Sequence, residues 1–100
     1  MSKNDEVKNL KENLLKSHWP KCNQIAQQLF ETGSEEAKQA LIEGLQGKRH
    51  HIRTAAIKFL TKFKDISLVE HISPLLSDPS HETRVQAIDS IKELSGDETS

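Results

Sequence analysis

Histidine and cysteine are the residue types in this 100-residue chain best suited to bind a transition metal, and it has five histidines and one cysteine. A zinc site needs three or four ligands at about 2.0–2.3 Å from the ion. His50 and His51 are adjacent, so we expect their side chains to diverge. His18 and His81 lie one helix–turn–helix unit away on either side, which places them roughly 10 Å or more from His50 if such units pack side by side. The sequence therefore predicts no metal site and no cofactor.

The single cysteine, Cys22, offers the only thiol for nucleophilic catalysis. Ile25, Ala26 and Leu29 follow it at helical spacing, which predicts a buried position, whereas a nucleophilic thiol needs some exposure and a nearby base. No Ser-His-Asp spacing, phosphate-binding glycine loop or pair of carboxylates stands out in the rest of the chain. We therefore expect a protein that is not an enzyme.

One cysteine cannot form an intrachain disulfide, which is typical of a protein in a reducing compartment. No apolar run approaches the roughly 18 residues of a membrane span. The first residues, MSKNDEVKNLKE, lack the apolar core of a signal peptide. These features predict a cytoplasmic protein that does not bind a membrane.

Positive charge is concentrated in one stretch of the chain. Residues 48–64 carry six Lys or Arg and no acidic residue, whereas residues 65–100 have a net charge of −6 and the whole chain has −1. A net charge near zero gives no general attraction to nucleic acid or to an anionic membrane. The basic stretch is better suited to a partner protein with an acidic segment. In the other interpretation, the basic residues bind no partner and only keep the surface of the protein solvated.

The elements that carry these residues are predicted to be helices, because prolines and glycines are few and the alternation of apolar and polar residues typical of strands is absent. Pro74 is expected to distort the end of the fifth helix, and Asp78 followed by Pro79 is expected to cap the start of the sixth. Trp19 either packs onto the second helix or stands exposed as an anchor for a partner. The apolar spacing predicts six helices, at about residues 4–16, 20–33, 34–46, 47–63, 66–76 and 78–96.

The chain repeats itself at a period of about 30 residues. A shift of 31 residues aligns residues 47–65 with residues 78–96 and sets Arg53 against Arg84. A shift of 30 residues extends the alignment back to the first pair of helices. The period predicts a single domain over residues 1–95, made of helix pairs at about 4–33, 34–64 and 65–95, and a polar tail at 96–100.

Two of the aligned segments resemble the HEAT repeat, in the short bacterial form also called the phycobilisome-lyase-like repeat. One reads Asp78-Pro79, Thr83-Arg84, Ala87, Ser90-Ile91 and Leu94, and the other reads Gly47, Ile52-Arg53, Ala56, Phe59-Leu60 and Phe63. The first pair of helices departs from the family, because Asn23 stands where the family prefers Arg. The resemblance implies an all-α, right-handed α-solenoid of three HEAT-like helical hairpins.

The resemblance also implies a ladder in which an Arg of one hairpin pairs with the turn Asp of the next. Arg53 would then pair with Asp78, and Arg84 holds the same position in the third hairpin. Gly47 and Ser17 stand at the other turns, so the ladder is expected to be incomplete at the first junction. Arg53, Asp78 and Arg84 are therefore expected to have a structural role.

In the family that this chain resembles, the second helix of each hairpin lines a concave face, and only the middle one is basic here. We expect a non-enzymatic protein-interaction module or adaptor that binds a partner with an acidic segment. Nucleic acid is the alternative, as a resemblance to HEAT-like alkylpurine glycosylases suggests, although Asp89 and Glu93 break the basic stripe. The expected partner-binding residues are Lys58, Lys62, Lys48, Arg49, Thr54 and Gln28.

The outer side of the last hairpin has few polar residues to cover it, so some of its apolar surface is expected to be exposed. Self-association through this C-terminal hairpin, or contact with a partner there, is a further expectation. Chromophore-lyase activity, which the family name suggests, has no residue in this chain that we can name as its carrier.

Overall fold

The computed structural model of the chain, which describes residues 3–96, is helical throughout and contains no strand within those residues. The expected all-α class with six helices is confirmed. No helix in this range is long and apolar enough to cross a membrane. Of the expected polar tail, all but Gly96 lies outside the described residues. The helices are α1 (Lys3–Lys16), α2 (Lys21–Thr32), α3 (Glu35–Gly44), α4 (His50–Thr61), α5 (Val69–Ile72) and α6 (His81–Ser95), and 3₁₀ segments at Ile66–Leu68 and Ser73–Ser77 flank α5.

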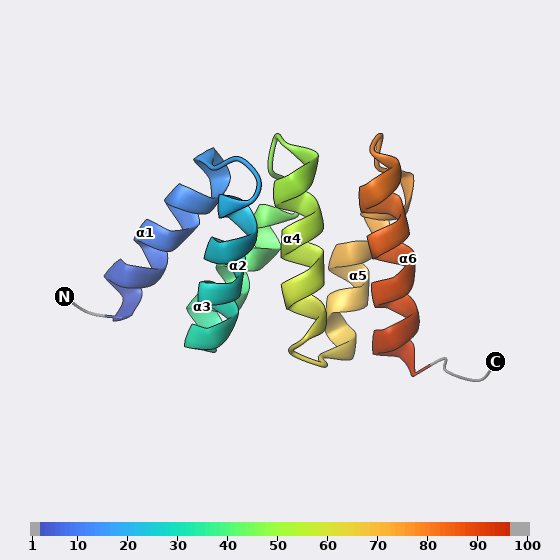
Figure 1. Ribbon diagram of the computed structural model, residues 1–100. Helices are drawn as coiled ribbons and strands as arrows, with labels where there is room; N and C mark the ends of the chain where they lie inside the picture. The colour runs from blue at the N-terminus through green and yellow to red at the C-terminus, as the bar shows by residue number, and fades with distance from the viewer. Residues whose placement is uncertain (1–2, 97–100) are drawn as a thin grey trace.

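The helices are arranged around α4. Helices α2, α4 and α6 lie side by side, with α3 and α5 behind them (Figure 1). Helix α4 packs against α2 on one side and against α6 on the other. Within each pair of consecutive helices, the first packs on the second: α1 on α2, α3 on α4 and α5 on α6. The molecule extends 47 × 25 × 19 Å. Helix α4 is therefore held from both sides.

Two glycines allow α4 to approach the helices before it. A Cβ added at Gly44 would lie 3.1 Å from the Cβ of Ala56 and 3.1 Å from Cδ2 of Leu14. A Cβ added at Gly47 would lie only 2.6 Å from Cγ2 of Ile52, a distance that sterics exclude. The turn between α3 and α4 is therefore packed so closely that glycine is required there.

Aromatic side chains fill the seam between α2 and α4. The ring of Phe30 on α2 meets Phe63, which follows α4, edge to face at a centroid distance of 5.1 Å. The same ring lies 6.4 Å from the ring of Phe59, which is buried on α4. Such aromatic pairs add about 0.5–1.5 kcal/mol beyond the area they bury. The junction of α2 and α4 is therefore held mainly by apolar packing.

The fifth helix is much shorter than the sequence pattern predicts. Instead of a helix over residues 66–76, the structure has a single α-helical turn, α5, between two 3₁₀ segments. Pro74 lacks an N–H, and its ring would clash with the carbonyl four residues earlier in a continuous helix. The broken segment still buries Leu68 and Ile72, whereas Leu76 is exposed.

The predicted start of the sixth helix is wrong by two residues. Helix α6 begins at His81, and its N-cap is Ser80, whose hydroxyl accepts the Thr83 N–H at 3.5 Å. Asp78 does not cap the helix. Its carboxylate accepts the N–H of Ser80 at 2.8 Å and two N–H groups of Arg53. The long-range pair with Arg53 has replaced the local capping role.

Candidate functional site

The expected pair between Arg53 and Asp78 is present and has bidentate geometry. Nε and Nη2 of Arg53 donate to the two carboxylate oxygens of Asp78 at 2.7 and 3.0 Å. Nη1 of Arg53 donates to the carbonyl oxygens of Gly47 and Lys48 at 2.9 and 3.1 Å. The two side chains are only 15% and 3% exposed. One arginine thus ties the turn before α4 to the turn before α6.

Arg84 repeats half of this arrangement. Its Nη1 donates to the carbonyl oxygens of Asp78 and Pro79 at 2.7 and 3.4 Å, the positions equivalent to Gly47 and Lys48. Burial raises the pKa of Asp78, but the hydrogen bonds from Arg53 and Ser80 and the charges of the two arginines outweigh it and leave the pKa below its usual value. Asp78 is therefore held as a carboxylate between two arginines.

Lys58 on α4 and Lys62, the residue that caps its C-terminal end, form what we call the cationic pair of α4. Both side chains are exposed, and their ammonium groups lie 5.5 and 5.8 Å from the centroid of the Phe59 ring between them. The neighbouring Lys38 and Lys64 form ion pairs with carboxylates. Within residues 3–96, no carboxylate oxygen lies within 4.0 Å of the Lys58 or Lys62 ammonium group. The two exposed ammonium groups thus lie side by side, and each contacts the ring of Phe59.

Thr54 and Gln28, the other two expected binding residues, lie in different surroundings. The Thr54 hydroxyl donates to the carbonyl oxygen of His50 at 2.8 Å and lies 2.9 Å from the Thr83 hydroxyl, so it is used in the contact between α4 and α6. Gln28 is exposed, but it lines a different hollow, between α1 and α2, together with Glu6 and other polar residues. The structure therefore places Gln28 apart from the lysines, whereas Thr54 lines one hollow together with Lys58.

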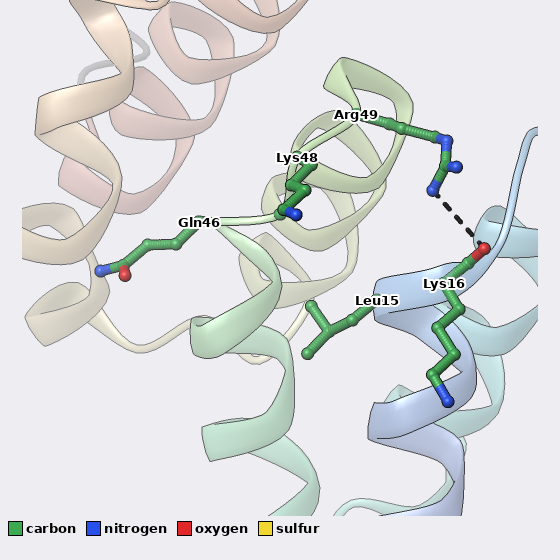
Figure 2. A pocket seen from close by; sticks show the side chains of 6 residues that line it. Leu15, Lys16, Gln46, Lys48 and Arg49 are labelled. Carbon is green, nitrogen blue, oxygen red and sulfur yellow. Dashed lines mark hydrogen bonds between the residues drawn. The ribbon is translucent and has the colours of Figure 1, made fainter.

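Lys48 and Arg49 lie at a second basic surface, which we call the turn pocket. It has a volume of about 460 Å³ and opens between the end of α1 and the turn before α4 (Figure 2). Nη1 of Arg49 donates to the carbonyl oxygen of Lys16 across it at 3.5 Å, a weak contact. The lining residues are Leu15, Lys16, Gln46, Gly47, Lys48 and Arg49.

Lys16 is a cation of the turn pocket that sequence reasoning missed. The signal was available, because a shift of 30 residues aligns Leu15 with Leu45 and so places Lys16 and Gln46 at equivalent helix ends. The structure brings both ends to one pocket together with Lys48. Three cationic side chains therefore surround a partly apolar hollow, which is suited to an anionic group attached to an apolar one.

The expectation that His50 and His51 diverge is wrong. Their ring centroids lie only 4.0 Å apart. Nε2 of His50 lies 4.0 Å from Oε2 of Glu82, and the His51 ring lies 6.1 Å from the ring of Trp19. Trp19 is 62% exposed, so it does not pack onto α2 as a buried side chain. The turns before α2, α4 and α6 thus meet in a cluster of ring and carboxylate groups.

Cys22 is fully buried, as its spacing predicts, and burial raises the pKa of its thiol. A thiol with a raised pKa and no exposure is a poor nucleophile.

A scan against protein-family models gives no match, and a search of curated proteins gives none either. Side-chain geometry is therefore what separates the candidate functions.

Proposed function

We propose that this chain is a non-enzymatic adaptor, acting in the cytoplasm without a cofactor, that binds an acidic segment of another protein through the cationic pair of α4. The observation that carries the proposal is that Lys58 and Lys62 stand exposed with no carboxylate partner among the described residues. Lys64, in the same basic stretch, pairs with Glu93, whereas Lys58 and Lys62 remain available to the carboxylates of a partner.

The surroundings of the two lysines favour recognition of a carboxylate-bearing segment. The ring of Phe59 lies within 6 Å of both ammonium groups and restrains their position, so less side-chain freedom is lost on binding. The turn pocket supplies a second set of cations at the other end of α4. A partner that contacts both surfaces would be positioned by charge at two points.

The architecture that we propose for this adaptor is a right-handed solenoid of three HEAT-like hairpins. The equivalent contacts of Arg53 and Arg84 with the carbonyl groups of their own turns, 31 residues apart, support this repeat. The row formed by α2, α4 and α6 supports it as well. In such an array each unit contacts only its neighbours, and the second helices form a continuous face for a partner.

Salt dependence distinguishes a protein partner from nucleic acid. The two probes are a fluorescent peptide rich in Asp, Glu and Leu and a fluorescent mixed-sequence DNA duplex. We expect the peptide to bind, and its affinity to fall less than about tenfold between about 50 and 200 mM salt, because only a few ionic contacts are lost. A duplex that makes about six phosphate contacts would lose about 10³-fold over the same range.

The charge-reversal variant Lys58→Glu with Lys62→Glu tests the surface itself. Its matched control is Lys8→Glu with Lys21→Glu, which makes the same change in net charge at exposed positions on α1 and α2. We expect the first variant to weaken peptide binding at least about tenfold and the control to change it less than about threefold. Equal binding by the wild type and the α4 variant would contradict the proposal. Tighter, steeply salt-dependent binding of the duplex would favour the nucleic-acid alternative.

A further inference from the structure

Three side chains with metal-binding groups converge where α4 meets α6. His50 and His51 are the first two residues of α4, and Glu82 is the second residue of α6. One donor atom from each of the three lies within 4.8 Å of the others. Nε2 of His50 lies 4.0 Å from Oε2 of Glu82. From these positions, small side-chain rotations can bring the three donor atoms to within bonding distance of one metal ion.

The donor set fits a divalent transition metal. Two imidazoles and one carboxylate are ligands that Zn²⁺ and its neighbours accept, whereas Mg²⁺ and Ca²⁺ prefer oxygen ligands only. Bond lengths of about 2.0–2.2 Å in a tetrahedral site place ligand atoms about 3.3 Å apart. The His50 and Glu82 side chains are 40% and 59% exposed, so both have room to move inward by the difference. A fourth position is left for water.

His51 provides an independent indication. Its Nδ1 atom is buried from solvent, and within residues 3–96 it has no hydrogen-bond partner. A buried polar atom without a partner is costly, by about 1–3 kcal/mol for a typical group. Coordination of Nδ1 itself to a metal ion is one arrangement that removes this cost. The two adjacent histidines thus differ: His50 already faces a carboxylate, and His51 lacks a partner.

We propose that His50, His51 and Glu82 form a transition-metal site that bridges α4 and α6. The site lies beside the hydrogen-bonded hydroxyls of Thr54 and Thr83, which join the same two helices. A metal ion bound there would cross-link the two helices and stabilise the folded chain by an amount that rises with the logarithm of the free metal concentration above the Kd. Lys58 lines the same hollow as His51 and Glu82, so the site adjoins the cationic pair of α4, but its role goes beyond the adaptor function.

The test uses the full chain without an affinity tag and with the metal ion alone as the probe. We expect Zn²⁺ to bind with a stoichiometry of one in calorimetry and to raise the melting temperature by about 2–5 °C at saturation. Cu²⁺ should quench the fluorescence of Trp19, the only tryptophan, because its ring lies 6.1 Å from that of His51. Zn²⁺ added in excess should restore this fluorescence.

The variants His51→Ala and Glu82→Gln should each weaken Zn²⁺ binding at least about tenfold. His71→Ala, which removes an exposed histidine on α5, is the matched control and should leave binding unchanged. Glu82 is exposed, so Glu82→Gln keeps the fold even if His51→Ala perturbs it. Absence of Zn²⁺ binding at about 100 μM metal, or binding that both site variants retain, would overturn the proposal.

Discussion

The two junctions of α4 are built from different chemistry, although the same helix forms both. Toward α2, the contact is aromatic and apolar, with Phe30 set against Phe59 and Phe63. Toward α6, it is polar, with the bidentate pair of Arg53 and Asp78. A repeat that is similar in sequence thus joins its units by packing at one junction and by a partly buried ion pair at the next.

The sequence explains this difference. The shifts of 30 and 31 residues that align the repeats place Asn23 against Arg53, and Gly47 against Asp78. The first junction therefore lacks both members of the ladder, and aromatic packing takes over its role. Apolar packing responds weakly to pH and salt, whereas a carboxylate pair fails when the carboxylate is protonated. We therefore expect acidification to weaken the junction of α4 with α6 and to have little effect on the junction of α4 with α2.

The largest effect is expected from Phe59→Ala at the first junction. Removing a buried aromatic side chain costs about 3–5 kcal/mol in lost packing and cavity formation, a large share of the roughly 5–15 kcal/mol that stabilises a small domain. The free energy of unfolding by urea measures it. Phe59→Leu is the control and should cost about half as much. A loss below about 1 kcal/mol for Phe59→Ala would mean that the aromatic seam does not hold α2 to α4.

At the second junction, Asp78→Ala should destabilise the chain by about 3 kcal/mol, because it leaves the partly buried Arg53 guanidinium without its partner. The double variant Arg53→Ala with Asp78→Ala should cost less than the sum of the two single variants, since the pair is lost only once. Thermal and urea unfolding of the four proteins give the coupling energy. Unchanged thermal stability of Asp78→Ala would contradict the ladder.

A smaller effect should appear on acidification, through Asp65 and Asp78. The hydrogen bonds from Lys38 and Ser67 lower the pKa of Asp65 to about 2, and the pKa of Asp78 is lowered as well. Both folded-state values lie below those of the unfolded chain. Their contribution to stability is therefore complete above about pH 4 and is lost as the pH falls toward 2.

The free energy of unfolding between pH 6 and pH 2 tests this expectation, with both end points taken as approximate limits of the titration of a carboxyl group. Asp65→Asn and Asp78→Asn should each flatten the acid side of the wild-type curve, while Phe59→Leu should shift the curve down without changing its slope. Parallel curves for wild type and both Asn variants would show that these carboxylates are not held as the geometry indicates.

The smallest effect on stability is expected from Ile88→Asp on α6. Leu76, Val85 and Ile88 are large apolar side chains that remain substantially exposed at the C-terminal end of the fold. We propose that this surface supports self-association. The substitution should change the free energy of unfolding by less than about 0.5 kcal/mol but lower the average mass in light scattering at high concentration. A wild-type protein that stays monomeric at high concentration would contradict the proposal.

The sequence predicted the features that depend on residues close together in the chain, such as the positions of the helices. The periodic apolar residues of α1 to α4 indicated helices where the structure has them. The pair of Arg53 and Asp78, 25 residues apart, was instead expected from the resemblance to HEAT repeats. The start of α6 was predicted wrongly because a contact from a distant arginine overrode the capping preference of Asp78. No local rule anticipates such a competition.

The candidate site was harder to predict than the fold. That His50 and His51 converge depends on side-chain rotation and on Glu82 from another helix, neither of which sequence spacing defines. The use of the Thr54 hydroxyl inside the junction likewise requires Thr83 opposite it. The exposure of Lys58 and Lys62 followed from the helical period, but their lack of acidic partners required the arrangement of the neighbouring helices.

The central claim is that the cationic pair of α4 binds a protein partner. The most direct measurement is a quantitative pull-down from the native cell extract, by mass spectrometry, with three baits: wild type, Lys58→Glu with Lys62→Glu, and Lys8→Glu with Lys21→Glu. We predict proteins with acidic segments that wild type and the control capture and that the α4 variant loses by at least about tenfold. Equal recovery of every partner by all three baits would contradict the claim.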